Sequence, residues 1–249
     1  DVVLEDDNLH TMSVAINQGR TIYNNIRKMI HFMISTNLTE IEVMLAGLVF
    51  GIGQPMNPMQ LLWINLVTDI FPGLALSLEP AEPDIMDRPP RDPDSAIIEG
   101  SDLKRMIFES GTIGLGTMGA YLYGMKRYGV GPAASTLAFN TLTLNELAHA
   151  YSSRSPYRNV FGGQNLRPNP HLTKAILGMG GLQAVVSTVP ALRRLLGTTP
   201  LGPADLVAIA AGVLLPLIAN EYTKPAPPLQ DILDDDEWLE DDNEQENVA

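Results

Sequence analysis

The chain has 249 residues, of which 45% are hydrophobic, and its 29 acidic and 16 basic residues give a formal net charge of −13. Because it contains no cysteine, disulfide bonds and thiolate metal sites are excluded. It also lacks a phosphate-binding GxxxxGK[ST] loop, an HExxH motif, a nucleophile elbow and an aromatic-basic nucleic-acid signature. We therefore expect no nucleic-acid partner, and we expect this segment alone to be catalytically silent.

Apolar residues are concentrated in six stretches, separated by charged and proline-rich segments. A membrane-spanning helix needs about 20 predominantly apolar residues. The six candidate spans are residues 30–50, 59–78, 103–123, 133–151, 172–189 and 206–219, the last of which is long enough only if it starts near Pro203. The sequence thus predicts an all-α, multi-pass membrane protein with a six-helix transmembrane bundle over residues 30–224.

Outside these spans the pattern changes from segment to segment. The first eight residues have the pattern of a short apolar strand that runs into acidic residues. Residues 10–28 have helical periodicity and no proline, so we expect one long helix that continues into the first span. The proline-rich segment 79–102 predicts an extended loop. Ten of the 29 acidic residues lie between Asp231 and Glu246, so residues 225–249 are expected to form a disordered acidic tail.

Basic residues predict the orientation of the bundle. With six spans, twelve of the 16 basic residues fall on the side that also holds both termini, which is the cytoplasm by the positive-inside rule. The loops at 51–58, 125–132 and about 190–202 should then face outward, together with the other four basic residues. We expect the cell (inner) membrane as the location. Since the chain starts with Asp1 rather than Met, we also expect it to be a segment of a longer protein.

The second span carries three oxygen-bearing side chains in QLLWINLVTD. In an α-helix, Asn65, Thr68 and Asp69 at i, i+3 and i+4 share one face at the middle of the bilayer, and Pro72-Gly73 then breaks the helix. Asn and Thr alone would more often join helices by hydrogen bonds. With Asp69 beside a helix break, the pattern favours ligands for a hard cation that has lost its water.

Two further spans contribute carboxylates. Asn37 and Glu40 lie one turn apart in the first span, where a charged Glu40 costs several kcal/mol unless it is protonated, paired or bound to a cation. Its alternative role is a packing hydrogen bond from a protonated glutamate, and the role of Glu42 stays open. In the fourth span Glu146 is a candidate ligand, and His149 either faces the same cavity or lies at the membrane interface.

Small residues in three spans predict close helix contacts in the lipid. They are Gly111, Gly114, Gly116, Gly119 and Ala120 in the third span, Gly178, Gly180 and Gly181 in the fifth, and Ala208, Ala210, Ala211 and Gly212 in the sixth.

Several of these segments together resemble the C-terminal half of a P-type cation-transporting ATPase, most closely the calcium-pump branch that includes the sarco/endoplasmic reticulum pumps. The resemblance is carried by DVVLEDDN, GRTIYNNIRKMI, STNLTE, PMQLLWINLVTD and EPDIMDRPPR, and it weakens after Asp102. It implies that residues 1–29 are the end of the phosphorylation domain and the stalk helix. It also implies that residues 24–28 and 84–91 couple the membrane helices to that domain.

The resemblance further implies a set of ion ligands. Asn37, Glu40, Thr68 and Asp69 would form one ion site, Asn65 and Asp69 would belong to a second, and the ligand from the eighth helix of the family maps onto Glu146 or, after a slip of one residue, Asn145. Relatives that move sodium and potassium usually have Asp in place of Asn65, which favours Ca²⁺ as the transported ion. Glu42 departs from the calcium-pump pattern, so a different ion or proton counter-transport stays open.

Much of the family's machinery is absent from this sequence. The DKTGT, TGD and GDGxND motifs and the proline-broken fourth helix are missing. ATP and Mg²⁺ would act only through the missing part, so the implied partners are the actuator, phosphorylation and nucleotide domains and the first four helices. The alternatives are a non-catalytic membrane module or relic that binds cations, and an ion-coupled secondary transporter. The latter usually has paired helix breaks in two inverted repeats, of which we find one break and no repeat.

Overall fold

The computed structural model describes residues 9–90, 96–161 and 166–225, and these residues form helices and loops without a strand. The expected all-α class is therefore confirmed. The expected strand at 1–8, the end of the loop at 91–95 and the acidic tail from 226 onward lie outside the described residues. In chain order the elements are α1 (Leu9–Val49), α2 (Pro58–Trp63), the π-helical turn η1 (Ile64–Thr68), α3 (Ile70–Leu76), α4 (Gly100–Tyr128), α5 (Pro132–Ser152), α6 (Pro170–Thr188), α7 (Pro190–Leu196) and α8 (Pro203–Tyr222).

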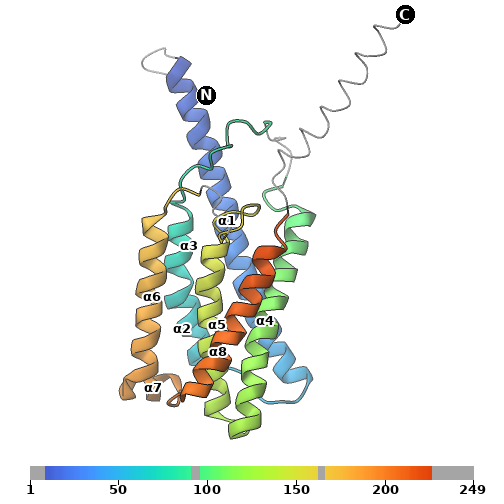
Figure 1. Ribbon diagram of the computed structural model, residues 1–249, viewed down its shortest axis with the longest axis vertical. Coiled ribbons are helices and arrows are strands. Elements are labelled where there is room, and N and C mark those ends of the chain that lie inside the picture. Colours follow the sequence, from blue (N-terminus) through green and yellow to red (C-terminus); the bar gives the residue numbers. More distant parts are fainter. Residues whose placement is uncertain (1–8, 91–95, 162–165, 226–249) are drawn as a thin grey trace, which may run out of the picture.

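Helix α1 is continuous over 41 residues, as the periodicity of its sequence predicts. At 1.5 Å per residue this length corresponds to about 60 Å, twice the roughly 30 Å thickness of a hydrocarbon core. Its N-terminal part accordingly projects beyond the other helices (Figure 1). The start of α1 and the end of α8 lie at this same end of the molecule.

Each of the six stretches predicted as spans is mostly helical in the structure, but their apolar character differs. Among the described residues, three stretches are long and apolar enough to cross a membrane: His10–Val49, Pro58–Leu76 and Pro203–Tyr222. A fourth results if α6 and α7, which meet at a 93° bend, form one span. Helices α4 and α5 are too polar to pass the same test, so the count of six spans stays a prediction.

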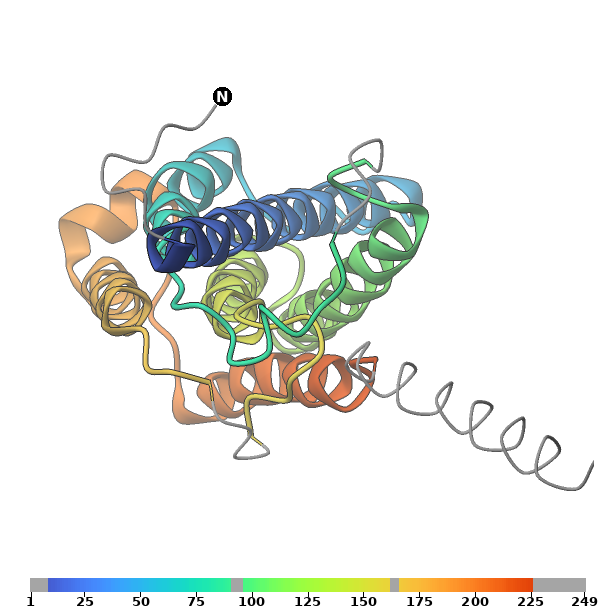
Figure 2. The same ribbon diagram turned by 90° about the horizontal axis from the view of Figure 1, so that it is seen from above.

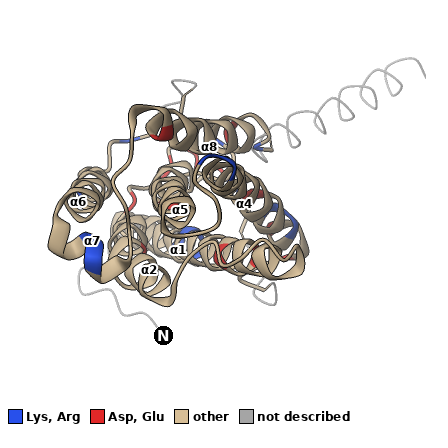
Figure 3. Cartoon of the chain, turned by 90° about the horizontal axis from the view of Figure 1, so that it is seen from below, with Lys and Arg blue, Asp and Glu red and all other residues tan. Residues whose placement is uncertain are grey.

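The polar composition of α5 follows from its place in the fold. Seen from above and from below, α5 lies among α1, α4, α6 and α8 (Figures 2 and 3), and it packs against α3 and η1 as well. Most of its side chains are buried, from Ala134 to Ser152. A helix that contacts protein on all sides has no need of a continuous apolar surface toward lipid. Its polar side chains are therefore available for contacts inside the bundle.

Two connections at the opposite end of the molecule differ in how well they were predicted. The segment 51–58 is a tight hairpin, in which Gly51 and Gly53 take positive φ values and Asn57 caps α2. The segment 190–202, predicted as a loop, instead contains the short helix α7, which starts with Pro190 at its first position. Basic residues lie on α7 and in the last turn of α4 at this end (Figure 3).

Glycine allows α4 and α8 to approach very closely. A Cβ atom added to Gly116 would lie 2.3 Å from the carbonyl oxygen of Gly212, and one added to Gly212 would lie 2.8 Å from the carbonyl oxygen of Gly116. The close contact predicted from small residues is therefore present between these two helices. It is not present at Gly178 and Gly181 of α6, where no heavy atom lies within 4 Å of an added Cβ.

Candidate cation site

The second predicted span is interrupted at its polar residues. The backbone N–H of Asp69 donates to the carbonyl of Ile64, five residues earlier, at 3.1 Å. Pro72, expected to end the helix, instead lies inside α3. A proline has no N–H to donate and its ring clashes with the carbonyl four residues before it, which is that of Thr68. The irregular turn thus falls upstream of Pro72, at Ile64–Thr68, and π-helical turns of this kind are frequent at functional sites.

Three carboxylates converge at this turn. Glu40 comes from α1, Asp69 follows η1, and Glu146 comes from α5. One oxygen of each lies within 4.8 Å of the others, and their residues are 8%, 3% and 0% exposed. The structure therefore brings together one acidic residue from each of the three spans in which the sequence predicted a ligand.

The carboxylate cluster lacks hydrogen-bond partners. Within the described chain, neither oxygen of Asp69 and neither oxygen of Glu146 accepts a hydrogen bond. A buried polar atom without a partner costs several kcal/mol, and adjacent negative charges add repulsion. Cations or protons that neutralise the cluster would remove both costs. This arrangement of oxygen ligands without nitrogen or sulfur matches a hard cation.

Asn65 and Thr68 lie beside the cluster with different contacts. The Nδ2 atom of Asn65 donates to both oxygens of Glu40, at 2.8 and 2.6 Å, and thereby fixes this carboxylate. For its Oδ1 to face an ion bound by Glu40, the amide would have to turn over. The buried Thr68 hydroxyl donates to the carbonyl of Ile64 at 2.7 Å, so its oxygen lone pairs are still available.

Asn37 and Glu42 are not brought to the cluster, although both lie on α1. The Asn37 side chain is exposed and its amide donates to the carbonyl of Met33 at 2.7 Å. Glu42 accepts a hydrogen bond of 3.0 Å from the hydroxyl of Ser110 on α4. The face of α1 that meets the other two carboxylates therefore contains Glu40 without its predicted neighbour Asn37.

Asn145 and Glu146, the two alternatives that the sequence left open, have different contacts in the structure. The amide of Asn145 donates to the carbonyl of Gly212 on α8 at 3.0 Å, whereas Glu146 faces Glu40 and Asp69. His149, which could have faced the same cavity, lies instead beside Glu109. The fourth span thus contributes only Glu146 to the carboxylate cluster.

Sequence analysis did not single out Thr36, whose side chain is fully buried beside the carboxylate of Asp69. Its hydroxyl donates to the carbonyl of Met33 at 3.2 Å. The signal for this residue was weak, because a threonine within an apolar span is common as a packing residue. Sequence analysis also did not single out Glu109, the neighbour of His149. This residue had a clearer signal, since an acidic side chain within a predicted span is costly and often functional.

The loop between α3 and α4 is held against the projecting part of α1. One guanidinium nitrogen of Arg20 donates to the carbonyls of Ile85 and Arg88, at 2.9 and 2.8 Å. Further along α1, Lys28 forms a buried ion pair of 2.6 Å with Glu82. Burial alone would raise the pKa of Glu82, but the charges of Lys28 and Arg88 hold that pKa below its ordinary value.

A second set of contacts joins this loop to the segment after α5. Arg154 pairs with Glu79 at 2.8 Å, and Arg158 pairs with Asp84 at 2.8 Å. Burial would raise the pKa of Asp84, but its hydrogen bonds and the charges of Arg88 and Arg158 keep that pKa below its ordinary value. The described part of the loop is therefore fixed to α1 on one side and to the α5–α6 connection on the other. The predicted coupling residue Arg91 lies outside the described residues.

Comparison with known proteins gives consistent matches. A family model described as "Cation transporting ATPase, C-terminus" matches residues 53–226. The chain is 32% identical over 242 residues to "Calcium-transporting ATPase 1" of Bacillus cereus, covering 91% of this chain and 27% of that protein. It is 35% identical over 216 residues to "Calcium-transporting ATPase" of Bacillus subtilis, covering 86% and 24%.

A mammalian relative is similar over the same extent. "Calcium-transporting ATPase type 2C member 1" of Mus musculus is 29% identical over 224 residues, which cover 90% of this chain and 24% of that protein. The chain thus spans about a quarter of the length of the curated relatives it matches.

Proposed function

This chain belongs to the family of cation-transporting P-type ATPases, whose C-terminal region it matches, and on this premise we propose that it is the membrane domain of an ATP-driven calcium pump. In this proposal Glu40, Asp69 and Glu146 bind Ca²⁺ within the bilayer, with oxygens from Asn65 and Thr68. ATP and Mg²⁺ act on the actuator, phosphorylation and nucleotide domains, which, like the first four helices, belong to another part of the same pump. Residues 1–29 connect to the phosphorylation domain, residues 30–224 form six spans, both termini are cytoplasmic, and the pump resides in the cell membrane.

The convergence of three buried carboxylates from three helices carries the proposal. Ca²⁺ takes six to eight oxygen ligands at about 2.3–2.6 Å in flexible geometry. The three carboxylates offer six oxygens, four of which have no hydrogen-bond partner in the described chain. Their three negative charges also exceed the charge of one Ca²⁺, so the same oxygens can take up protons when the ion leaves.

Asn37 is the weakest member of the proposed ligand set. The resemblance to calcium pumps supports its role, but its amide is exposed and bonded to Met33. To reach the carboxylates, the side chain would have to change rotamer and give up that hydrogen bond. We therefore expect Asn37→Ala to weaken Ca²⁺ binding less than a change at Asp69.

Substitutions of the carboxylates, with a matched pair on α1, provide the sharpest test. In the full-length gene product, reconstituted in lipid vesicles, Asp69→Asn and Glu40→Gln should abolish Ca²⁺-dependent phosphorylation by ATP. Glu42→Gln is the control, since it removes a carboxylate two residues away that faces Ser110 and not the cluster. Phosphorylation by inorganic phosphate, which does not need bound Ca²⁺, should persist in all three variants and show that they fold.

Near-normal Ca²⁺ affinity in Asp69→Asn would remove the ion site from this cluster. A full-length product that forms no phosphoenzyme with either ATP or inorganic phosphate would instead favour the non-catalytic membrane module. An equal loss in Glu42→Gln and Glu40→Gln would show that the effect is general to intramembrane carboxylates on α1.

The fixed loop after α3 supports a second part of the proposal, namely that it transmits movement of the stalk to the ion site. Lys28→Met should lower the Ca²⁺ transported per ATP hydrolysed, because it leaves Glu82 buried without this partner on α1. The control is Lys104→Met, which removes the charge of an exposed lysine on α4 outside both coupling segments. Equal transport ratios in the two variants would contradict the coupling role.

A further inference from the structure

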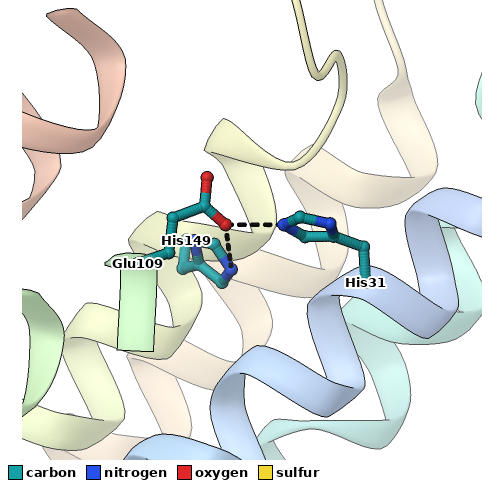
Figure 4. A group of neighbouring side chains, drawn as sticks. All are labelled: His31, Glu109 and His149. Carbon is teal, nitrogen blue, oxygen red and sulfur yellow. Dashed lines mark hydrogen bonds and ion pairs between the residues drawn. The ribbon is translucent and has the colours of Figure 1, made fainter. Parts of the chain in front are cut away.

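Two of the four histidines in the chain meet one glutamate away from the carboxylate cluster. His31 comes from α1, Glu109 from α4 and His149 from α5, and their side chains point toward one another (Figure 4). His31 lies near the start of the first predicted span, Glu109 toward the start of the third and His149 near the end of the fourth, which are the ends predicted to face the cytoplasm. We refer to these three residues as the histidine cluster.

The distances within the histidine cluster are close to those of a metal site. Nε2 of His31 lies 2.6 Å and Nε2 of His149 lies 3.8 Å from Oε2 of Glu109. One candidate ligand atom from each of the three residues lies within 4.8 Å of the others. Tetrahedral Zn²⁺ with bonds of 2.0–2.1 Å separates its ligands by about 3.3 Å. Small changes of rotamer would therefore bring the three atoms around one ion.

The surroundings of the cluster orient Glu109 and leave His149 uncommitted. Nε of Arg105 donates to Oε1 of Glu109 at 2.6 Å, so Oε2 is directed at the histidines. His149 is 3% exposed, its Nδ1 has no hydrogen-bond partner within the described chain, and its Nε2 has only a long 3.5 Å contact to Ser153 besides Glu109. Its ring packs against Phe32. A buried imidazole without a committed partner is suited to a metal ligand.

An ion could reach the cluster from the side of the projecting helix. A cavity of about 100 Å³ is lined by His31, Glu109, Arg105, Ser152, Ser153 and Lys224, among others. This volume is large enough for water molecules that would complete the coordination of an ion. The positive charges of Arg105 and Lys224 oppose a divalent ion, so we expect weaker binding than at a structural zinc site with four protein ligands.

We propose that His31, Glu109 and His149 form a second metal site, which binds a borderline transition-metal ion of the Zn²⁺ class and which is separate from the cation site of the carboxylates. Two imidazoles and one carboxylate favour Zn²⁺, Co²⁺ or Ni²⁺ over Ca²⁺, which takes oxygen ligands. A bound ion would cross-link α1 to α4 and α5. It would thereby hold the projecting helix in a fixed position relative to the bundle.

The test compares four proteins, each the full-length gene product purified in detergent, stripped with a chelator and kept in excess Ca²⁺. Wild type should bind one Zn²⁺ more than His31→Gln and His149→Gln in calorimetric titrations. Because loss of an outer partner alone weakens metal affinity about 10- to 100-fold, loss of a ligand should weaken it by about 100-fold or more. His171→Gln, a change on the exposed start of α6, is the control and should bind as wild type does. With Co²⁺, visible absorption typical of tetrahedral coordination should disappear only in the first two variants.

Unchanged Zn²⁺ affinity in His31→Gln would overturn the proposal, and this variant decides the matter if His149→Gln fails to fold, because His31 is partly exposed. Displacement of the ion by excess Ca²⁺ would also overturn it, since it would assign the binding to carboxylates. An equal loss in His171→Gln would likewise overturn it, because binding would then not depend specifically on the histidine cluster.

Discussion

Replacing Gly116 by alanine tests the close contact between α4 and α8. The added methyl would lie 2.3 Å from the carbonyl oxygen of Gly212 and 2.6 Å from Cγ of Pro216. Cβ atoms essentially never come closer than 3.0 Å to another heavy atom. The two helices must therefore separate locally by roughly 0.7 Å, the difference between 3.0 and 2.3 Å. The Gly212 carbonyl also accepts the amide of Asn145, so the movement disturbs α5 as well.

The magnitude follows from two opposing effects. Overpacking of a well-packed interior costs about 1–3 kcal/mol, and the upper part of this range applies because backbone and a proline ring cannot move aside like a flexible side chain. Replacing a glycine within a helix by alanine returns about 0.5–1 kcal/mol. We expect a net loss of about 2 kcal/mol in the free energy of unfolding.

The matched control is Gly119→Ala on the same helix, where no heavy atom lies within 4 Å of the added methyl. This variant should be as stable as wild type, or more stable by up to about 1 kcal/mol. The measurement is reversible unfolding of the purified full-length protein in mixed micelles with increasing SDS. Equal stability of the two variants would refute the reasoning, because it would mean that α4 and α8 do not approach each other at Gly116.

Three further predictions concern the loop, the cation site and the orientation. The pKa of Glu82 lies below its ordinary value of 4.5, so the charged carboxylate stabilises the fold above about pH 4.5, and this stabilisation is lost as the pH falls through the lowered pKa. In thermal unfolding measured as a function of pH, Glu82→Gln should therefore lack this part of the loss of stability in acid. Thr36→Val should weaken Ca²⁺ binding about tenfold without unfolding the protein, if its hydroxyl serves the ion held by Asp69; unchanged Ca²⁺ affinity would exclude the hydroxyl as a ligand. Single cysteines at Gln54 and at Lys104, both exposed, should react with an impermeant reagent from opposite sides of the membrane, and labelling of both from one side would contradict the orientation.

Most of the helical segments could be predicted from the sequence because their pattern is local. The absence of proline between residues 10 and 50 and the regular apolar spacing there predict one helix, and α1 has that form. Helix α7 was missed because its seven residues, PALRRLL, are too short for periodicity to separate a helix from a loop. The sequence likewise does not explain why α4 and α5 are less apolar than the other helices. The reason depends on which helices lie inside the bundle, and this is a property of the tertiary structure.

The candidate site was predictable in its residue types but not in its geometry. The spacing of Asn65, Thr68 and Asp69 was interpreted with 3.6 residues per turn, but the chain forms a π-helical turn there. Asn37 and Glu40 lie one turn apart, yet their directions differ enough that only Glu40 reaches Asp69. The histidine cluster joins residues from three helices that are far apart in the sequence, and no local sequence pattern predicts that they lie together.

The buried, polar helix α5 has a consequence for how the protein is made. An acidic side chain adds up to about 2.5–3.5 kcal/mol, the value at the centre of a span, to the cost of inserting a helix alone, and α5, which is predicted to span the membrane, carries Glu146 along with several amides and hydroxyls. Its passage from the translocon into lipid should therefore depend on helices that leave together with it. Helix α4, which precedes it through a short turn and packs along it, is in position to be that companion. During biosynthesis the chain would thus acquire its central helix as part of a hairpin, before α6 and α8 complete the enclosure.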